Sequence, residues 1–313
     1  MSAPDRHLLS IRDLEPSEVQ ELLDTAESMR SVSEREVKKL PTLRGRTIVN
    51  LFYEASTRTR VSFELAAKRL SADVVNVASS ASSIEKGESL RDTGRTLAAM
   101  GVDAIVLRHP SAGAAARLAQ CVDCSVINAG DGAHEHPTQA LLDLLTIRRH
   151  FGRIEGLRVA IAGDISHSRV ARSTALGLSR MGARVVLVAP PSMLPRGVEQ
   201  LGCATSSNLD EELGSLDVLY LLRIQKERHR ESLVPSEAEF AALYGLTPAR
   251  LERLPAACAV MHPGPMNRGL EIAWEAAESG RSLVEQQVAA GVCVRMAVLY
   301  RLLGAPAMVE AAS

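Results

Sequence analysis

Short runs rich in β-branched residues alternate with amphipathic helical segments along most of this 313-residue chain. Such an alternation is typical of parallel sheets, because each parallel strand needs a crossover connection, usually a helix, before the next strand. The alternation begins near residue 46 and starts again near residue 158. The pattern therefore predicts an α/β fold of two doubly wound domains, each with a parallel sheet flanked by helices.

The two halves of the chain give two sets of predicted elements, separated near residue 150. Proline favours the first turn of a helix and glycine its end, so Pro137 and Gly152 bracket the last helix of the first half. We expect a first domain at residues 1–149, a second at 150–282, and a final helix within 283–313 that packs back on the first domain. The predicted strands are 46–54, 73–78, 103–108, 125–129, 158–163, 184–188, 218–222 and 259–262, and the predicted helices are 59–70, 90–100, 114–121, 137–150, 169–181 and 283–303.

The composition excludes several classes of function. The formal net charge is −1 and only 3% of the residues are aromatic, whereas capture of nucleic acids or anionic membranes needs a basic excess or stacking rings. The N-terminal segment carries charges where a secretory signal needs an apolar stretch, and no apolar run approaches the ~20 residues that span a bilayer. We therefore expect a cytoplasmic protein that binds neither nucleic acid nor membrane.

The five cysteines fit no disulfide framework in a chain of this length. Cys121 and Cys124 form a CxxC pair, but a zinc or redox site needs a second pair or a nucleophilic turn, and the sequence has neither. Ordinary packing is therefore the favoured interpretation of both thiols.

A dense group of hydroxyl and guanidinium side chains follows the first predicted strand. The segment from Glu54 to Arg60 reads EASTRTR. Ser56 and Thr57 are good N-cap residues, and a helix start offers free N–H groups and the positive end of the helix dipole. Two arginines and three hydroxyls within five residues of such a start suit a phosphate group. A capped helix with two solvated arginines is the alternative.

The segment STRTR, flanked by FYEA and VSFE, resembles the carbamoyl-phosphate motif of the aspartate/ornithine carbamoyltransferase family. Four further segments match the family in order and spacing, so the resemblance spans nearly the entire chain. It implies a carbamoyltransferase, and we expect neither a cofactor nor a metal ion. The four segments are Lys86-Gly-Glu-Ser, Arg108-His-Pro, His136-Pro-Thr-Gln139 and His262-Pro-Gly-Pro265.

On this resemblance, one group of residues binds carbamoyl phosphate. Carbamoyl transfer places negative charge on a carbonyl oxygen in the transition state, so catalysis needs fixed donors aimed at that oxygen. His136 acts either as such a donor or as a general base, and the phosphate leaving group, itself a base, favours the donor role. The implied catalytic residues are Arg58, Thr59, Arg108, His136 and Lys86. The implied carbamoyl-phosphate ligands are Ser56, Thr57, Arg58, Thr59, Arg108 and His136, with Gln139, Gly264 and Pro265 on the carbamoyl amide.

The second substrate of the family is an amino acid, and an aspartate brings two carboxylates that need cationic partners. Arg169 follows one predicted strand of the second domain, and Arg223 and Gln225 follow another. Each arginine alone reads as a solvated charge, but two of them just after successive strands favour a carboxylate site. The resemblance implies aspartate binding by Lys86, Arg169, Arg223 and Gln225.

Lys86 belongs to a loop, residues 79–89, that in the family reaches the neighbouring subunit's active site. The resemblance thus implies a homotrimer with shared active sites, and it leaves open a larger complex with a regulatory chain or a dihydroorotase. Some family members carry a second basic residue just before the lysine, where this chain has Glu85. We therefore expect this loop to contribute less to phosphate binding.

Three features favour aspartate over ornithine as the acceptor. Ornithine-specific members usually show HPCQ and HCLP where this chain has HPTQ and HPGP. They also carry a Ser-Met-Gly loop, which this sequence lacks. The pair Arg223 and Gln225 suits a carboxylate and would repel an ornithine ammonium. The expected products are N-carbamoyl-L-aspartate and phosphate, in an early step of pyrimidine (UMP) biosynthesis.

Three other interpretations fit only parts of the sequence. His134 and His136 form an HxH pair, but no carboxylate or third histidine follows at metal-ligand spacing. Segment 159–164 suggests a dinucleotide-binding turn, but it lacks GxGxxG, and no acidic residue ends the next strand. A non-catalytic paralogue would have lost part of the implied catalytic set, and the whole set is present.

Overall fold

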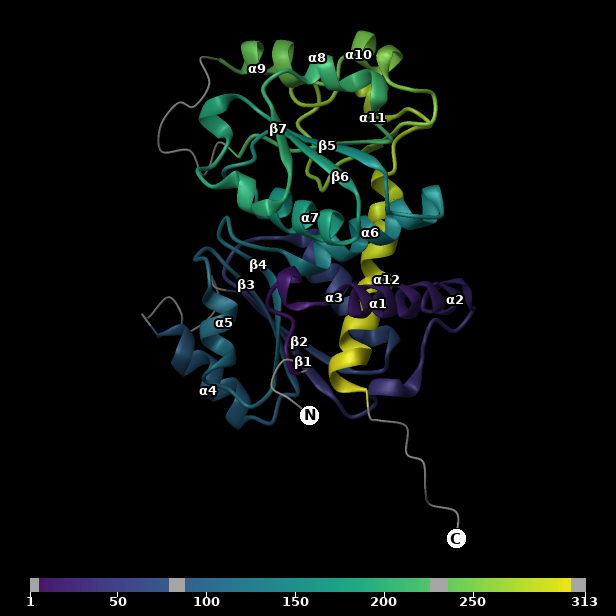
Figure 1. Ribbon diagram of the computed structural model, residues 1–313. Coiled ribbons are helices and arrows are strands. Elements are labelled where there is room, and N and C mark those ends of the chain that lie inside the picture. Colours follow the sequence, from purple (N-terminus) through teal and green to yellow (C-terminus); the bar gives the residue numbers. More distant parts are fainter. Residues whose placement is uncertain (1–5, 79–87, 226–235, 305–313) are drawn as a thin grey trace. The chain divides into compact units, whose positions relative to one another are not determined.

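The computed structural model describes residues 6–78, 88–225 and 236–304 (Figure 1). Parallel strands alternate with helices in two separate sheets, which confirms the predicted fold class. The eight predicted strands are present, and their ends differ from the prediction by at most two residues. Within the described part of the chain, no helix is both long enough and apolar enough to cross a membrane.

The chain forms two compact units. Unit 1 contains residues Met1–Thr138 and Ala290–Ser313, and unit 2 contains Gln139–Ala289. The sequence analysis places the divisions near residues 149 and 282 instead, and its assignment of one substrate to each domain stays a prediction.

A four-stranded parallel sheet forms the centre of unit 1, in the spatial order second, first, third and fourth strand. The third and fourth strands are buried along most of their length, as expected when helices cover both faces of a parallel sheet. The elements are β1 (Thr47–Phe52), α3 (Thr57–Arg69), β2 (Asp73–Ala78), α4 (Leu90–Ala99), β3 (Ala104–His109), α5 (Ala114–Ala119) and β4 (Ser125–Asp131). Figure 1 shows α4 and α5 on one side of this sheet and α3 on the other.

Buried apolar side chains fill both faces of this sheet. On one face, Leu51, Leu107 and Leu118 belong to a cluster that joins β1 and β3 to α5. On the α3 side, Phe63 is fully buried. The guanidinium of Arg295, on α12 (Val284–Leu303), lies 5.1 Å from the centre of the Phe63 ring, within the range of a cation–π contact.

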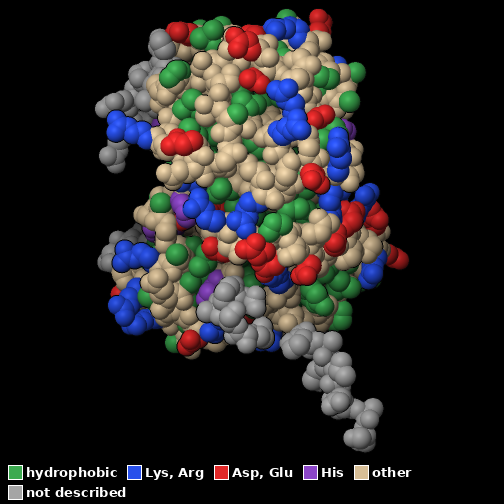
Figure 2. Space-filling model, viewed as in Figure 1, with side chains coloured by type: hydrophobic (Ala, Val, Ile, Leu, Met, Phe, Trp, Pro, Cys, Tyr) green, Lys and Arg blue, Asp and Glu red, His purple; other side chains and the backbone are tan. Residues whose placement is uncertain are grey.

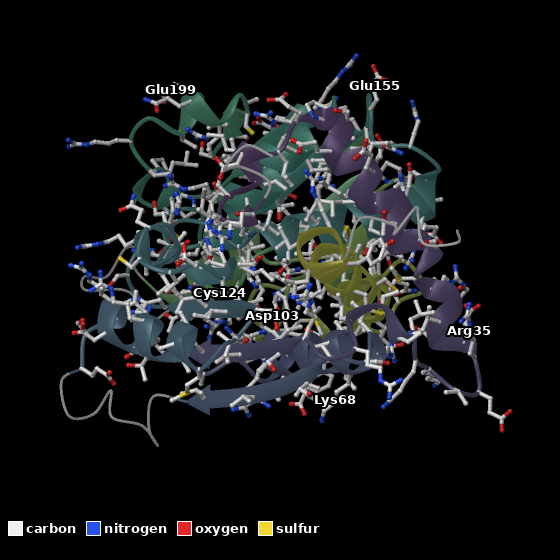
Figure 3. The ribbon with its side chains drawn as sticks, turned by 90° about the horizontal axis from the view of Figure 1, so that it is seen from below. Arg35, Lys68, Asp103, Cys124, Glu155 and Glu199 are labelled. Carbon is white, nitrogen blue, oxygen red and sulfur yellow. The ribbon has the colours of Figure 1, made fainter. Side chains whose placement is uncertain are left out.

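The charged side chains of α1 (Pro16–Ser28) are all acidic, whereas α2 (Arg30–Glu34) has one arginine and one glutamate. Figure 2 shows acidic and basic side chains together on this face of unit 1. Exposed Arg35 and Lys68 point outward from this unit (Figure 3). The surface of these elements therefore offers no continuous basic stripe for a polyanion.

Unit 2 is built on a five-stranded parallel sheet in the order β7-β6-β5-β8-β9. Its edge strand β7 was not predicted, because its three residues are exposed or partly exposed and lack an apolar pattern. The sheet elements and their main crossover helix are β5 (Arg158–Ala162), α7 (Arg169–Arg180), β6 (Arg184–Val188), β7 (Ala204–Ser206), β8 (Val218–Leu221) and β9 (Ala259–Met261).

Local sequence signals explain the ends of the longest crossover helices. Helix α6 (Pro137–Phe151) begins at a proline, and Gly152 follows it with φ 72°. The N–H of Gly152 donates to the carbonyl oxygen of Arg148 at 2.8 Å, which satisfies one of the last carbonyls of the helix. The remaining short helices are α8 (Leu209–Glu212), α9 (Glu237–Tyr244), α10 (Pro248–Arg253) and α11 (Trp274–Ala277), with 3₁₀ turns η2 (Ile11–Asp13), η3 (Pro41–Leu43), η6 (Pro191–Met193), η7 (Val198–Leu201) and η8 (Leu213–Ser215).

The strand order reverses beside the first strand of each sheet. This point lies between β1 and β3 in unit 1, and between β5 and β8 in unit 2. Connections leave such neighbouring strands toward opposite faces, so ligands of doubly wound sheets bind beyond the carboxyl ends at this place. Most of the predicted site residues follow these four strands.

Candidate active site

The first group of candidate residues lies where β1 leads into α3. Ser56 is the N-cap residue of α3, and within the described residues its side chain makes no capping hydrogen bond. By contrast, the hydroxyl of Ser168 caps α7. The first-turn N–H groups of a helix have no intrahelical partner. Thr57 and Arg58 are exposed and Thr59 is buried, so the start of α3 combines backbone donors, hydroxyls and a guanidinium in the way an anion site needs.

Arg108 lies at the end of β3, and its guanidinium reaches both neighbouring strands. Its Nη1 donates to the carbonyl oxygen of Ala129 on β4 at 3.2 Å. Its Nε lies 3.5 Å from a carboxylate oxygen of Glu54, which follows β1. The two side chains are only 14% and 23% exposed, so the pair holds the guanidinium at the carboxyl edge of the sheet before any ligand binds.

His136 follows β4 and is 4% exposed. The loop before it is fixed by two carboxylates. Asp131 lies 3.1 Å from Nδ1 of His134, and Glu135 accepts a hydrogen bond from the N–H of Ile11 at 2.9 Å. Burial raises the pKa of Asp131, but hydrogen bonds from His134 and neighbouring donors outweigh it, so the pKa lies below its ordinary value. These carboxylates therefore anchor the loop that carries His136.

A buried carboxylate joins the ends of β5 and β8 in unit 2. Asp164 lies two residues after the end of β5 and is fully buried. Its Oδ1 lies 2.8 Å from Nδ1 of His167, and its Oδ2 accepts the N–H of Gln225 at 3.2 Å. The Nε2 of Gln225 then donates to the carbonyl oxygen of His167 at 3.0 Å. The three residues form a closed ring of hydrogen bonds that fixes the Gln225 amide.

Sequence reasoning missed Asp164 and His167. A usable signal was present in the segment GDISHSR, where an acidic residue directly follows a buried strand and a histidine follows three positions later. That spacing allows a carboxylate to hold a histidine within one turn, as the structure has it.

The two predicted arginines of unit 2 lie at the ends of the same two strands. Arg169 is the first residue of α7 and only 5% exposed. Ser168 precedes it and accepts the N–H of Ala171 at 3.1 Å, which fixes the start of the helix. Arg223 follows β8 and is partly exposed. Since β5 and β8 are neighbours, both cations lie at the edge that also holds Gln225.

A glycine allows the ends of β5 and β8 to approach each other. Gly163 has φ 131°, and a Cβ at this position would lie 2.5 Å from the carbonyl oxygen of Leu222. Any other residue would force the two segments apart. The next residues along these segments are Asp164 and Arg223, so this contact sets the spacing between them.

Gly264 and Pro265 follow β9 in a loop fixed by a buried histidine. The N–H of Gly264 donates to Nδ1 of His262 at 2.8 Å, so Nε2 carries the ring proton. That Nε2 lies 3.2 Å from Oε1 of Glu271, and both side chains are fully buried. The histidine is therefore a neutral brace that shapes the loop.

The structure places the predicted residues in two sets, one in each unit. Unit 1 brings together, at the carboxyl edge of β1, β3 and β4, Ser56, Thr57, Arg58, Thr59, Arg108 and His136. Unit 2 carries Gln139, Arg169, Arg223, Gln225, Gly264 and Pro265. Lys86 lies outside the described residues. The role of each residue stays a prediction.

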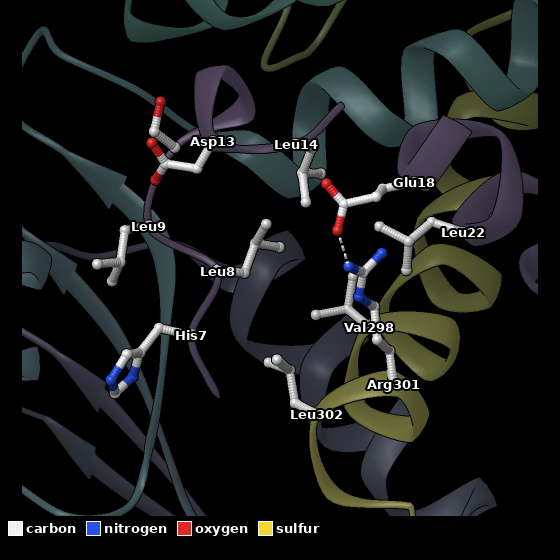
Figure 4. A pocket seen from close by; sticks show the side chains of 11 residues that line it. His7, Leu8, Leu9, Asp13, Leu14, Glu18, Leu22, Val298, Arg301 and Leu302 are labelled. Atoms are coloured by element: carbon white, nitrogen blue, oxygen red, sulfur yellow. Dashed lines mark hydrogen bonds and ion pairs between the residues drawn. The ribbon is translucent and has the colours of Figure 1, made fainter. Parts of the chain in front are cut away.

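Unit 1 also contains a pocket that none of the predicted residues lines. It lies between the N-terminal segment, α1 and α12, with Leu8, Leu22 and Val298 among its apolar walls (Figure 4). Arg301 is paired with Glu18 there (Figure 4). The predicted phosphate ligands all lie elsewhere in unit 1, at the carboxyl edge of the sheet, so that edge is the better candidate.

The CxxC pair has no arrangement for chemistry. Cys124 is 8% exposed, and burial raises the pKa of its thiol. The Sγ of Cys121 lies 3.3 Å from the carbonyl oxygen of Arg117. Among the described residues, no group of three His, Cys, Asp or Glu side chains could hold a metal ion.

Comparison with known proteins identifies the family. Residues 6–149 match the model of the aspartate/ornithine carbamoyltransferase carbamoyl-P binding domain. Residues 155–302 match the model of the Asp/Orn binding domain of the same family.

Three relatives illustrate the similarity. An aspartate carbamoyltransferase catalytic subunit from Thermobifida fusca is 60% identical over 299 residues, covering 96% of each chain. The crystal structure of aspartate transcarbamoylase from Trypanosoma cruzi in complex with carbamoyl phosphate and aspartate is 34% identical, covering 96% of this chain and 97% of that one, with a TM-score of 0.89. Ornithine carbamoyltransferase from Gloeobacter violaceus is 29% identical, covering 96% and 99%, with a TM-score of 0.80.

Both halves of the chain thus match consecutive domain models of one family, and the relatives cover nearly its whole length. The chain belongs to the aspartate/ornithine carbamoyltransferase family.

Proposed function

We propose that the chain transfers the carbamoyl group of carbamoyl phosphate to the amine of L-aspartate, giving N-carbamoyl-L-aspartate and phosphate. The amine nitrogen attacks the carbonyl carbon, a C–N bond forms, and the C–O bond to phosphate breaks. Phosphate leaves with the electron pair of that bond, and it accepts the proton that the amine loses. The observation that carries the proposal is the set of anion-binding groups at the switch point of each sheet, together with the family match.

The groups of unit 1 suit the carbamoyl phosphate. The start of α3 supplies the phosphate with donors, and Arg108, already oriented by Glu54, donates to the carbonyl oxygen. His136 acts beside it as a second donor. Fixed donors of this kind are worth roughly 10²–10³ in rate each, because they meet a charge that develops only in the transition state.

The groups of unit 2 suit an acceptor with carboxylates. Arg169 and Arg223 bring two positive charges to the ends of β5 and β8, and Gln225 adds a fixed amide. An ornithine side chain ends in an ammonium, which two arginines would repel. The chain is 60% identical to a relative named aspartate carbamoyltransferase catalytic subunit and 29% identical to one named ornithine carbamoyltransferase, which supports the same acceptor.

An acceptor assay tests the proposal. We expect labelled carbamoyl phosphate to carbamoylate L-aspartate and to give little product with L-ornithine. Arg169→Gln should raise the KM for aspartate at least tenfold and leave the KM for carbamoyl phosphate nearly unchanged. Arg172→Gln, one turn along the same helix, is the matched control. Equal turnover of ornithine and aspartate would refute the choice of acceptor.

We further propose a homotrimer in which Lys86 of one subunit serves the neighbouring active site. The support is the resemblance of the KGES segment, since a cyclic head-to-tail ring gives every site one such donor. Arg58→Ala and Lys86→Ala trimers should each be nearly inactive. Mixed after dissociation, about three quarters of the rings are hybrids with one intact site in three, so activity should return to roughly a quarter of wild type. A mixture as inactive as its parents would refute sharing.

The remaining proposals concern the cellular setting. The five free cysteines suit a reducing compartment, which supports an enzyme that works in the cytoplasm in pyrimidine synthesis. Native mass measurement of the protein purified from its own cells, with partners retained, would show the trimer and any regulatory chain or dihydroorotase bound to it.

A further inference from the structure

A single carboxylate inside unit 2 joins four elements of that unit. Asp143, on α6, is fully buried. Its Oδ1 accepts Nε2 of Gln139 at 3.1 Å and Nε2 of Gln287 at 2.8 Å. Its Oδ2 accepts the hydroxyl of Thr174 at 2.9 Å and that of Tyr220 at 2.8 Å. Each oxygen thus receives two donors, the full complement that an ionised carboxylate takes.

The two oxygens of Asp143 face different kinds of donor. The hydroxyls of Thr174 and Tyr220 can also accept a hydrogen bond by rotating, whereas each glutamine Nε2 can only donate, so Oδ1 must remain an acceptor. Burial raises the pKa of Asp143 to about 6, against the hydrogen bonds of Gln287, Tyr220, Thr174 and Gln139, which lower it. Asp143 is therefore ionised at neutral pH and becomes protonated as the pH falls through about 6.

The Oδ1 of Asp143 decides which end of the Gln139 amide faces outward. An amide places its oxygen and its nitrogen on opposite sides, and only the nitrogen can donate to a carboxylate. With Nε2 committed to Asp143, the Oε1 of Gln139 is the end directed away from this carboxylate. The amino group of a carbamoyl ligand has two N–H donors and needs acceptors, so Oε1 is the end it requires.

The same carboxylate acts on a second acceptor through Gln287. Because Nε2 of Gln287 donates to Asp143, its Oε1 is free to accept the N–H of His262, at 3.0 Å. His262 in turn holds the N–H of Gly264 through its Nδ1. The backbone carbonyls of Gly264 and Pro265 are the other acceptors expected for the carbamoyl amino group.

We propose that Asp143 is a positioning residue that turns the acceptors of unit 2, Gln139 directly and the Gly264–Pro265 segment through Gln287 and His262, toward the amino group of carbamoyl phosphate. The inference rests on the proposed function, since it takes carbamoyl phosphate as the substrate. It explains why a helix-interior aspartate at the centre of a unit is bonded only to donors. Asp143 touches no substrate itself, so its effect is on the recognition of one chemical group.

Two ligands that differ in that one group give the test. Acetyl phosphate has the phosphate and carbonyl of carbamoyl phosphate, with a methyl group in place of the amino group. Asp143→Ala removes the acceptor of both glutamine amides, so nothing holds the amide of Gln139 or Gln287 in its present orientation. We expect the KM for carbamoyl phosphate to rise roughly tenfold to hundredfold, since a buried donor would then face a donor. The inhibition constant of acetyl phosphate should change less than twofold.

Asp210→Ala is the matched control. Asp210 is a carboxylate of the same unit, bonded to Arg250 and Arg253 and to none of the predicted site residues. Its replacement should lower the melting temperature and leave the ratio of the two affinities unchanged. A purely structural role of Asp143 predicts the same outcome for both variants, with carbamoyl and acetyl phosphate affected alike.

A second variant covers the case in which Asp143→Ala does not fold. Gln287→Met keeps the length of the side chain and removes the link from Asp143 to the N–H of His262. The KM for carbamoyl phosphate should then rise roughly threefold to tenfold, about the effect of one lost hydrogen bond, with acetyl phosphate inhibition changed less than twofold. Asp143→Asn keeps an oxygen for the two glutamines while its N–H₂ donates to the hydroxyl oxygens of Thr174 and Tyr220, so it should retain the wild-type ratio of the two affinities.

The outcomes separate the two proposals. Wild-type enzyme that carbamoylates no aspartate would overturn the proposed function. Active wild type with an unchanged ratio of carbamoyl phosphate to acetyl phosphate affinity in Asp143→Ala would overturn the positioning role, as would an unchanged ratio in Gln287→Met if Asp143→Ala does not fold. A ratio that falls in these variants and not in Asp210→Ala supports it.

Discussion

In unit 1, the predicted phosphate ligands Thr57 and Arg58 are exposed at the start of a helix, whereas in unit 2 Arg169 is 5% exposed and Gln225 lies in a ring of hydrogen bonds. The first set depends mainly on backbone geometry, since a helix start supplies donors wherever it occurs. The second depends on Asp164, a fully buried carboxylate that the substrate would not touch.

The difference follows from the cost of burying polar groups. An exposed hydroxyl or guanidinium is largely solvated, so placing it costs little free energy of desolvation. A buried amide or guanidinium without partners would destabilise the fold by several kcal/mol, so carboxylates must accompany it. Two predicted ligand-binding residues of unit 2 are therefore held by supporting carboxylates. Asp143 holds Gln139, and Asp164 holds Gln225.

The largest expected effect is that of replacing Arg108. This residue belongs to unit 1, but its largely buried guanidinium is held by a carboxylate, Glu54, as the buried groups of unit 2 are. Arg108→Ala should lower kcat about 10²–10³-fold, since a donor to the developing oxyanion is lost. Steady-state kinetics would measure it. Arg46→Ala is the control, because Arg46 pairs with Asp103 at the opposite end of the same sheet. A loss in kcat below tenfold for Arg108→Ala would show that unit 1 works by binding the phosphate alone.

A smaller effect is expected at two glycines, one in each unit. A Cβ on Gly163 would lie 2.5 Å from the carbonyl oxygen of Leu222, and one on Gly132 would lie 2.8 Å from the backbone N of Ala112. Each alanine substitution should displace only the loops of its own unit. We expect Gly163→Ala to raise the KM for aspartate roughly tenfold, and Gly132→Ala to raise that for carbamoyl phosphate by a similar factor, about what a displaced hydrogen bond costs.

Gly214→Ala is the control for both, because a Cβ there meets no atom within 4 Å among the described residues. If either substitution raised both KM values equally, the predicted residues of unit 1 and those of unit 2 would not act independently. The comparison between the units would then have to be revised.

The same contrast explains how much of the molecule was predictable from the sequence. The buried strands and the ends of α6 follow from local patterns of apolar residues, proline and glycine, so their predictions are confirmed within two residues. The segment Ser56–Arg60 was recognisable because its ligands are contiguous. Short elements such as β7 and α11 were missed, since three or four residues carry no period.

Of the two supporting carboxylates, Asp143 was not predictable, for a different reason. Asp143 looks like any polar residue within a helix, and one of its partners, Gln287, lies 144 positions away. Only the tertiary fold brings them together. Asp164 was within reach, because it directly follows a predicted strand and precedes His167 by three residues.

The smallest expected effect separates two serines that occupy the same position relative to their helices. Ser168 caps α7 by accepting the N–H of Ala171 at 3.1 Å, so Ser168→Ala should lower the free energy of unfolding by about 1 kcal/mol, measured by urea denaturation. Ser56 makes no capping hydrogen bond within the described residues, so Ser56→Ala should cost less than half of that. If the Ser56 hydroxyl is reserved for the phosphate, its loss should instead raise the KM for carbamoyl phosphate roughly fivefold to tenfold, the effect of one lost hydrogen bond to a charged group. Equal losses of stability in the two variants, with no change in that KM, would mean that Ser56 is an ordinary cap and that the phosphate is held by the backbone and Arg58 alone.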